Sequence, residues 1–317
     1  MLTFQEIQIN DIDNELMSSA NELFSWYPQA IDISSYHRFR LNSSRNSRLF
    51  GIFSNKNIEA VVEHSEDDYD SALLGLKAGG LRNILLRNGL TENQRETIYD
   101  FALKNYSIFL QDQQYGFVFS TCSNWNGTLL NILQRYGYKY ILSWGKCFTI
   151  NTTDCKLPHQ FEVKIIKLAD DLPAILNMAK DYFKGGRFYL DPNIDNTKAD
   201  QLYYDLIDNS YNNPDVSFCV LYKGKVPIGC IILNYSVLPI VGGKKLKAGS
   251  VRLLVYNKTE GYKGLSELFL RRTINLLLQE NDIVESGVEL HNLPSMKIHL
   301  NAGFKFNYIY SAFHAWF

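Results

Sequence analysis

Two segments of this 317-residue chain are alike, and their likeness limits how the chain can fold more than any other feature. NGTLLNILQRYGYK runs from Asn126 to Lys139, and NLPSMKIHLNAGFK runs from Asn292 to Lys305. Asparagine, isoleucine, glycine, an aromatic residue and lysine match at equal offsets. A chain of this length has room for two domains of about 150 residues. The sequence therefore predicts one αβ domain that occurs twice.

The order of elements around each segment supports a duplication. In the first half, residues 49–53 and 58–62 predict a hairpin, Thr91–Asn105 a helix capped by Thr91, and Gly116–Cys122 a strand. A helix over Asn126–Tyr136 and strands within Lys139–Ile150 follow. The second half predicts helices over Ala169–Phe183, Glu260–Glu280 and Pro294–Ala302. Its strands are expected at 216–222, 226–235, 249–256, 283–291 and 304–317. The fold class is α/β, with a mixed sheet of the α+β kind.

The polar stretch Asn151–His159 contains Pro158 and is the best candidate linker. We expect a first domain over residues 1–155 and a second over 156–317.

Composition excludes several classes of protein. The formal net charge is −1, so no bulk field favours nucleic acid or an anionic membrane. The apolar runs are far shorter than the roughly 20 residues that span a bilayer, and the acidic start is unlike a signal peptide. The five cysteines lack CxxC spacing and the histidines are scattered, which argues against a metal site. We expect reduced thiols in a cytoplasmic protein. A homodimer is left open.

One segment of the second half suits an anionic ligand. In LLVYNKTEGYKGLSELFL, Leu253–Leu270, a strand enters a loop with Gly261 and Gly264 that opens a long helix. Backbone N–H groups at a helix start have no intrahelical partner, and the helix dipole favours negative charge there. Glycine lets a phosphate approach the backbone closely. Two glycines before a helix could also form a simple turn.

With NLPSMKIHLNAGF, Asn292–Phe304, this segment resembles the GNAT (Gcn5-related N-acetyltransferase) superfamily over roughly the last 155 residues. In the family's Q/R-x-x-G-x-G/A loop, Gly264 matches, Ser266 is a small substitute and Gly261 replaces the usual Gln or Arg. Ser295 replaces the alanine of the second motif, and His299 stands where tyrosine is usual.

The resemblance implies an acyl-CoA site and a tandem GNAT fold. The strand Leu254, Val255 and Tyr256 would pair with pantetheine, and Asn292 would touch it. His299 would be the general acid for the departing thiolate. The loop would hold the pyrophosphate through Gly261, Tyr262, Lys263, Gly264, Leu265 and Ser266. No metal is implied.

The first half departs from this pattern. Its corresponding loop, Gly89–Ile98, has no glycine after Gly89, and Glu92 and Glu96 would repel phosphate. Leu133 stands where the second half has His299. The first half is therefore interpreted as a degenerate copy that helps to shape the acceptor site.

GRFYLDP, Gly186–Pro192, resembles a segment of the nucleotide-amino-sugar N-acyltransferases, such as the TDP-fucosamine acetyltransferase type. In that resemblance Arg187 would bind the diphosphate, Phe188 would stack on the substrate, and Asp191 would line the pocket. Alternatively, Arg187 and Asp191 pair with each other and Phe188 is core. The implied reaction moves acetyl, or a larger acyl group such as 3-hydroxybutanoyl, to a dTDP-linked amino-deoxy sugar for bacterial surface polysaccharide.

The general base remains open among four candidates, Asp191, Glu289, His291 and His314. Two other classes also remain. One is a different tandem GNAT enzyme, similar to mycothiol synthase or a peptidyl transferase, and the other is a non-catalytic module that binds CoA.

Overall fold

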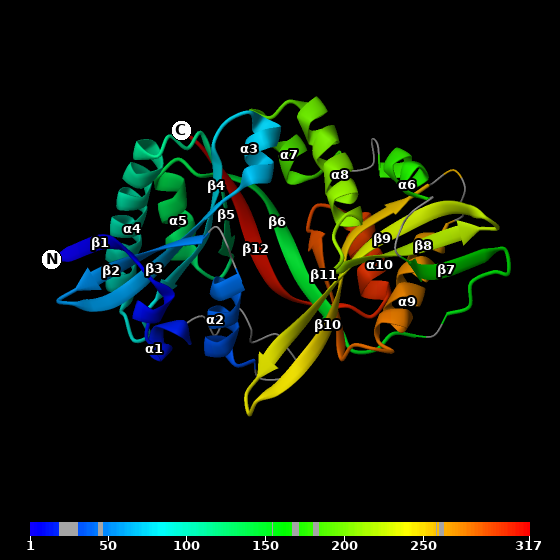
Figure 1. The fold of residues 1–317 in the computed structure, drawn as a ribbon, viewed down its shortest axis with the longest axis horizontal. Helices are drawn as coiled ribbons and strands as arrows, with labels where there is room; N and C mark the ends of the chain where they lie inside the picture. Colours follow the sequence, from blue (N-terminus) through cyan, green and yellow to red (C-terminus); the bar gives the residue numbers. More distant parts are fainter. Residues whose placement is uncertain are drawn as a thin grey trace. The chain divides into compact units, whose positions relative to one another are not determined.

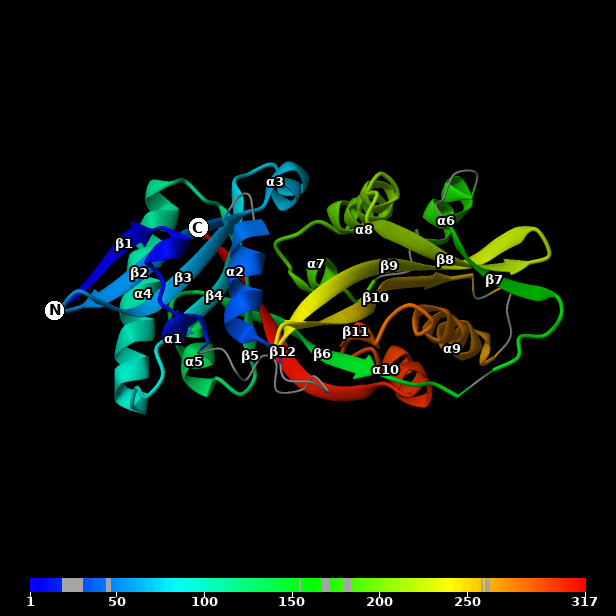
Figure 2. The same cartoon turned by 60° about the horizontal axis from the view of Figure 1, so that its bottom comes forward.

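A computed structural model describes residues 1–18, 31–43, 47–153, 155–166, 171–179, 184–257, 259 and 263–317. Within these ranges no helix is long and apolar enough to cross a membrane. The chain forms two compact units (Figures 1 and 2). Unit 1 comprises Met1–Ser143, Pro239–Gly243 and Ile309–Phe317, and unit 2 comprises Trp144–Leu238 and Lys244–Tyr308. Neither unit is one continuous stretch of sequence, because each contains residues from both halves.

Unit 1 has the strand order β1-β2-β3-β4-β5-β12. The neighbours pair antiparallel except β4 and β5, which are parallel. Its strands are β1 (Leu2–Ile7), β2 (Ser47–Ser54), β3 (Asn57–Glu66), β4 (Ala78–Leu86), β5 (Phe117–Ser123) and the last part of β12 (Lys305–Trp316). Its helices are η1 (Ile9–Asp11), α1 (Asn14–Met17), α2 (Ile33–Ser43), α3 (Asp68–Leu74), α4 (Glu92–Asp112) and α5 (Gly127–Arg135).

Unit 2 has the strand order β6-β11-β10-β9-β8-β7, with β10 and β11 parallel. Its strands are β6 (Lys139–Thr149, in unit 2 from Trp144), β7 (Phe161–Ile166), β8 (Val216–Lys223), β9 (Val226–Ile240), β10 (Lys244–Tyr256) and β11 (Ile283–Glu289). Its helices are α6 (Leu172–Ala179), α7 (Arg187–Leu190), α8 (Asn196–Tyr211), α9 (Leu265–Leu277) and α10 (Leu293–Asn301).

Helices cover both faces of the unit 2 sheet, as Figure 2 shows. One apolar core joins α9 to the sheet through Phe269, Ile274 and Val284, among others. The other core joins α6 and α8 to the opposite face through Ile175, Ile207 and Phe218. Burial on both faces explains why β8 and β9 have nearly continuous apolar runs rather than a strict alternation.

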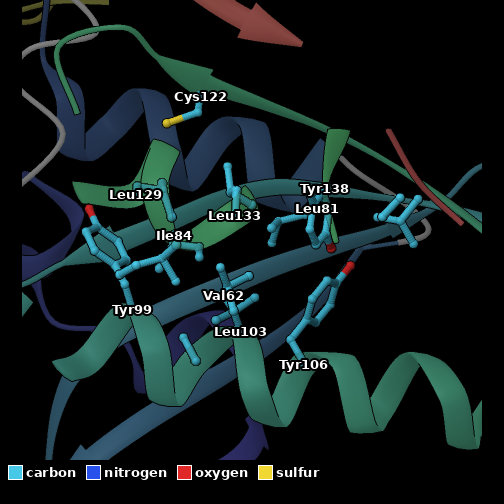
Figure 3. Packing of buried hydrophobic residues seen from close by; sticks show 14 of the residues in the cluster. Val62, Leu81, Ile84, Tyr99, Leu103, Tyr106, Cys122, Leu129, Leu133 and Tyr138 are labelled. Carbon is cyan, nitrogen blue, oxygen red and sulfur yellow. The ribbon is translucent and has the colours of Figure 1, made fainter. Parts of the chain in front are cut away.

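Unit 1 has its main core between the sheet and helices α4 and α5. Figure 3 shows Leu103 and Tyr106 of α4 packing toward Val62 of β3 and Leu133 of α5. Leu133 is fully buried. The position that corresponds to His299 thus serves as core in this unit.

The duplication extends to the boundaries of the elements. β5 and β11 begin at Phe117 and Ile283, and α5 and α10 begin at Gly127 and Leu293, so one constant offset relates both pairs. Asn126 and Asn292 cap the two helices in the same way, because each side chain accepts a hydrogen bond from the third helical N–H. Gly137 and Gly303 both follow with positive φ.

Several predicted elements differ in extent. Helix α9 begins at Leu265, so Lys263 and Gly264 form a turn instead of helix, and residues 260–262 lie outside the described ranges. The C-terminal stretch forms one strand, β12. The predicted elements do not include α8, although its buried residues Ala199, Leu202 and Ile207 recur at helical spacing. The predicted functional division at residue 155 stays a prediction.

Candidate acyl-transfer site

The parallel ladder between β10 and β11 stops before either strand ends. It runs from Ala248 opposite Ile283 to Val251 opposite Ser286, whereas β10 continues to Tyr256 and β11 to Glu289. The Ser286 hydroxyl lies 3.3 Å from the Val251 carbonyl, at the last paired position. Beyond this point the facing backbone N–H and C=O groups of β10 and β11 do not pair with each other. Such groups need another hydrogen-bond partner.

The side chains of β10 also change face where the ladder stops. Val251 packs in the core on the α9 side, whereas Leu253 and Val255 pack on the side of α6 and α8. In a regular strand these three residues would share one face. The alternation is therefore broken between Val251 and Leu253, as it is in a β-bulge.

Helix α9 follows β10 and begins at a glycine in the left-handed region. Gly264 has φ +94°, and a Cβ at this position would meet nothing within 4 Å. A residue without a side chain cannot cap the first-turn N–H groups, so they remain suited to an anion. Glu267 lies in that first turn. Its carboxylate accepts hydrogen bonds from the Arg271 guanidinium at 2.9 Å and from the Asn301 amide at 2.8 Å, and the charge of Arg271 offsets its own.

The corresponding helix of unit 1 is closed by its own side chains. The Thr91 hydroxyl accepts from the Gln94 N–H, and the Gln94 side chain accepts from the Thr91 N–H at 2.8 Å. This capping box occupies donors that an anion would need. The ladder between β4 and β5 also stops early, at Leu81 opposite Ser120, and the Ser120 hydroxyl lies 3.2 Å from the Leu81 carbonyl. Unit 1 thus has the strand geometry without the open helix start.

The predicted CoA residues lie around this junction where the structure describes them. Gly261 and Tyr262 lie outside the described residues. Lys263 and Gly264 are exposed, Ser266 is half-buried, and the Leu265 side chain is buried in the core. Val255 and Tyr256 are also buried and Leu254 half-buried, so these residues could offer a ligand mainly their backbone. The Asn292 side chain caps α10. Their contact with CoA stays a prediction.

His299 is buried, and its ring nitrogens bond within unit 2. Nδ1 lies 2.8 Å from the Ser295 carbonyl, so this nitrogen donates. Nε2 lies 3.0 Å from the Ser286 hydroxyl and, in a neutral ring, accepts from it. Burial lowers the pKa of His299 to about 4. Only about one His299 ring in a thousand is then charged at pH 7, so the ring is a poor proton donor to a thiolate. Its predicted catalytic role stays untested.

A second group of polar residues lies where β11 ends. Glu289 is the last residue of β11, and burial raises the pKa of its carboxyl group. The charge of His291, whose Nε2 lies 3.7 Å from the Glu289 carboxylate, opposes this shift. The His291 Nε2 also donates to the Gly185 carbonyl at 2.9 Å. Two of the four candidate bases, Glu289 and His291, are thus neighbours. A carboxylate with a raised pKa is suited to accept a proton.

Tyr203 of α8 joins this group, although nothing in the sequence marked it. Its pKa is raised by burial and then by the charge of Glu289. Its ring stacks on Tyr189, with centroids 6.4 Å apart. A Cβ at Gly186 would overlap the Tyr203 hydroxyl, so only glycine leaves this phenol in place.

The remaining predicted residues have internal contacts. The Arg187 guanidinium lies 3.9 Å from the centroid of the Phe188 ring, and Phe188 is core. Asp191 is buried, and its Oδ1 accepts from the Asn193 N–H at 2.9 Å. His314 is fully buried in unit 1, edge-on to Phe117 at 4.9 Å. The predicted roles of these residues stay predictions.

Among the described residues, no three His, Cys, Asp or Glu side chains gather as a metal site would require. None of the five cysteines forms a disulfide, and four are buried.

Solved structures share this fold. A tandem GNAT protein from the clavulanic acid biosynthesis pathway aligns over 100% of this chain and 98% of its own, with a TM-score of 0.60 and 11% identity. A GCN5-related N-acetyltransferase from Sphaerobacter thermophilus covers 99% of this chain and 95% of its own, at 0.65 and 9%. The fold is a tandem GNAT fold.

The fungal glucosamine N-acetyltransferase region of a multi-domain β-N-acetylglucosaminidase also aligns, with a TM-score of 0.65 and 12% identity over 99% of this chain and 38% of that one. No protein-family profile and no curated protein matches the sequence. At these identities the likeness shows the fold and leaves the reaction to be argued from residues.

Proposed function

We propose that this protein is an acyl-CoA-dependent N-acyltransferase whose active site lies in unit 2. The observation that carries the proposal is the contrast between the two helix starts. Helix α9 begins at Gly264 in the left-handed region beside the split strands, whereas α4 is closed by the Thr91 capping box. The residues fit CoA, because an open glycine and uncapped helical N–H groups suit a pyrophosphate.

In the proposed reaction, the acceptor amine attacks the thioester carbonyl carbon. A C–N bond forms, the C–S bond breaks, and CoA leaves as a thiolate. Glu289, ionised, takes the proton of the attacking amine, with His291 beside it. A free thiol has a pKa of about 8.5, so its thiolate leaves readily. Alignment of the two reactants can supply roughly 7–11 kcal/mol of the barrier.

For the acceptor we propose the amine of a nucleotide-linked amino sugar, with acetyl or a larger acyl group as donor. The support is the segment Gly186–Pro192. The Gly185 carbonyl just before it accepts a hydrogen bond from His291, which neighbours Glu289, and Gly186 lies against the Tyr203 hydroxyl. The fungal glucosamine N-acetyltransferase region shares the fold, and this is consistent with an amino sugar as the acceptor.

Two glycine substitutions test the CoA site. Gly264 and Gly224 both have positive φ and open space where a Cβ would stand. Alanine at either position strains the backbone by roughly 1–2 kcal/mol. We expect Gly264→Ala to weaken CoA binding about tenfold or more, measured by calorimetry, and Gly224→Ala to leave it unchanged. Equal CoA affinity in both variants would contradict the proposed site.

A further inference from the structure

The middle of strand β11 presents an exposed glycine with empty space above it. Gly287 has an ordinary negative or extended φ, and a Cβ built on it meets nothing within 4 Å. Glycine weakens a strand interior, because it costs conformational entropy and packs no side chain. A glycine in such a place often marks a site where a ligand approaches the backbone.

Two cationic side chains flank this glycine. Lys146 of β6 stands directly opposite Gly287, and residues opposite each other in an antiparallel pair share a face. On the other side, the Ser250 hydroxyl of β10 reaches the Glu285 carboxylate at 3.2 Å, which places both on that same face. Arg252 is two residues beyond Ser250 on β10, at the break in the alternation, and its charge acts on Lys146.

The charges around Gly287 interact with one another. Burial lowers the pKa of Lys146, Glu285 opposes this shift, and the charge of Arg252 adds to it. Arg252 is exposed, and Lys146, Glu285 and Glu289 are half-buried. Lys146 and Arg252 together carry two positive charges against the one negative charge of Glu285. Glu289, two residues further along the same strand, supplies a second negative charge, so the two cations suit an anionic group of a ligand while Glu289 suits its ammonium group.

We infer that the acceptor carries an oxyanion, which sits over Gly287 between Lys146 and Arg252, while its amine points to Glu289. The inference rests on the proposed function in placing the acceptor amine at Glu289. It adds a substrate class, namely amines with a phosphoryl or carboxylate group nearby. Lys146 comes from β6, on the N-terminal side of the polar stretch 151–159, so a residue of the first sequence half helps to select the acceptor.

The test uses the full chain saturated with CoA, so that an anion cannot bind the CoA pyrophosphate site. Inorganic pyrophosphate and succinate are titrated separately by calorimetry, which separates a phosphoryl from a carboxylate preference. We expect one of them to bind the parent protein. Lys146→Met and Arg252→Met should each weaken that binding about tenfold or more, because a charged hydrogen bond is lost.

Gly287→Val supplies the variant that separates binding from folding. Valine favours strands and has open space here, so the thermal midpoint should hold or rise while anion binding is lost. Thr121→Val, at the corresponding position of β5 in unit 1, is the matched control and should bind both anions like the parent. No binding of either anion to the CoA-saturated parent, or undiminished binding to Gly287→Val, would overturn the inference. A parent that binds no CoA would instead refute the proposed function.

Discussion

The buried ring of His299 gives a quantitative prediction on acid stability. Its pKa is about 4 in the folded protein, against about 6.5 for an unperturbed histidine. Between these two values the unfolded chain binds a proton that the folded ring does not. The free energy of unfolding therefore falls as the pH drops from about 6.5 toward 4. Above about pH 6.5 the stabilisation from the neutral His299 ring is present in full. A gap of about 2.5 units corresponds to roughly 3 kcal/mol in full, and to about 2 kcal/mol by pH 5.

His299→Leu tests this magnitude, because Leu133 already occupies the corresponding buried position in unit 1. Urea unfolding is measured at pH 7.5 and pH 5 for both proteins. We expect the loss of stability between the two pH values to be about 2 kcal/mol smaller in the variant. Ring proton shifts in an NMR titration give the pKa directly.

Two results would refute the reasoning. Equal pH dependence in both proteins would mean that the ring is not held neutral by burial. A His299 pKa near 6.5 would restore the charged ring as a proton donor at neutral pH, and His299→Leu should then also lower kcat. If the pKa is low and kcat is retained, the histidine is structural.

Three further predictions follow from the site and its copy. Glu289→Gln should lower kcat about a hundredfold and remove the acidic limb of the kcat/KM profile, which lies above the usual carboxyl range because burial raises the Glu289 pKa. An unchanged profile would assign the base elsewhere. Gly186→Ala should displace the Tyr203 phenol and raise the acceptor KM, with CoA affinity unchanged by calorimetry. A normal acceptor KM would show that Tyr203 is not part of the pocket. Thr91→Ala should cost about 1 kcal/mol in urea unfolding through loss of the α4 cap, and CoA affinity should hold. Weaker CoA binding in this variant would argue for a site in unit 1.

The sequence by itself determined the duplication and the local elements that carry it. The likeness of residues 126–139 to 292–305 corresponds to elements with matching boundaries, matching asparagine caps and matching positive-φ glycines. These features are local, because a cap or a left-handed glycine involves residues only a few positions apart. For the same reason the asymmetry between Gly264 and the Thr91 capping box could be predicted from the chain alone.

Only the tertiary structure decided which strands complete each unit and which side chains meet. Strand pairing is non-local, so the sequence did not place β12 beside β5 or β6 beside β11. Lys146 and Gly287 share one face through that pairing although they are far apart in the chain. Tyr203 meets Gly186 for a similar reason. Burial, which depends on the whole fold, then fixed the pKa of His299 and raised that of Glu289.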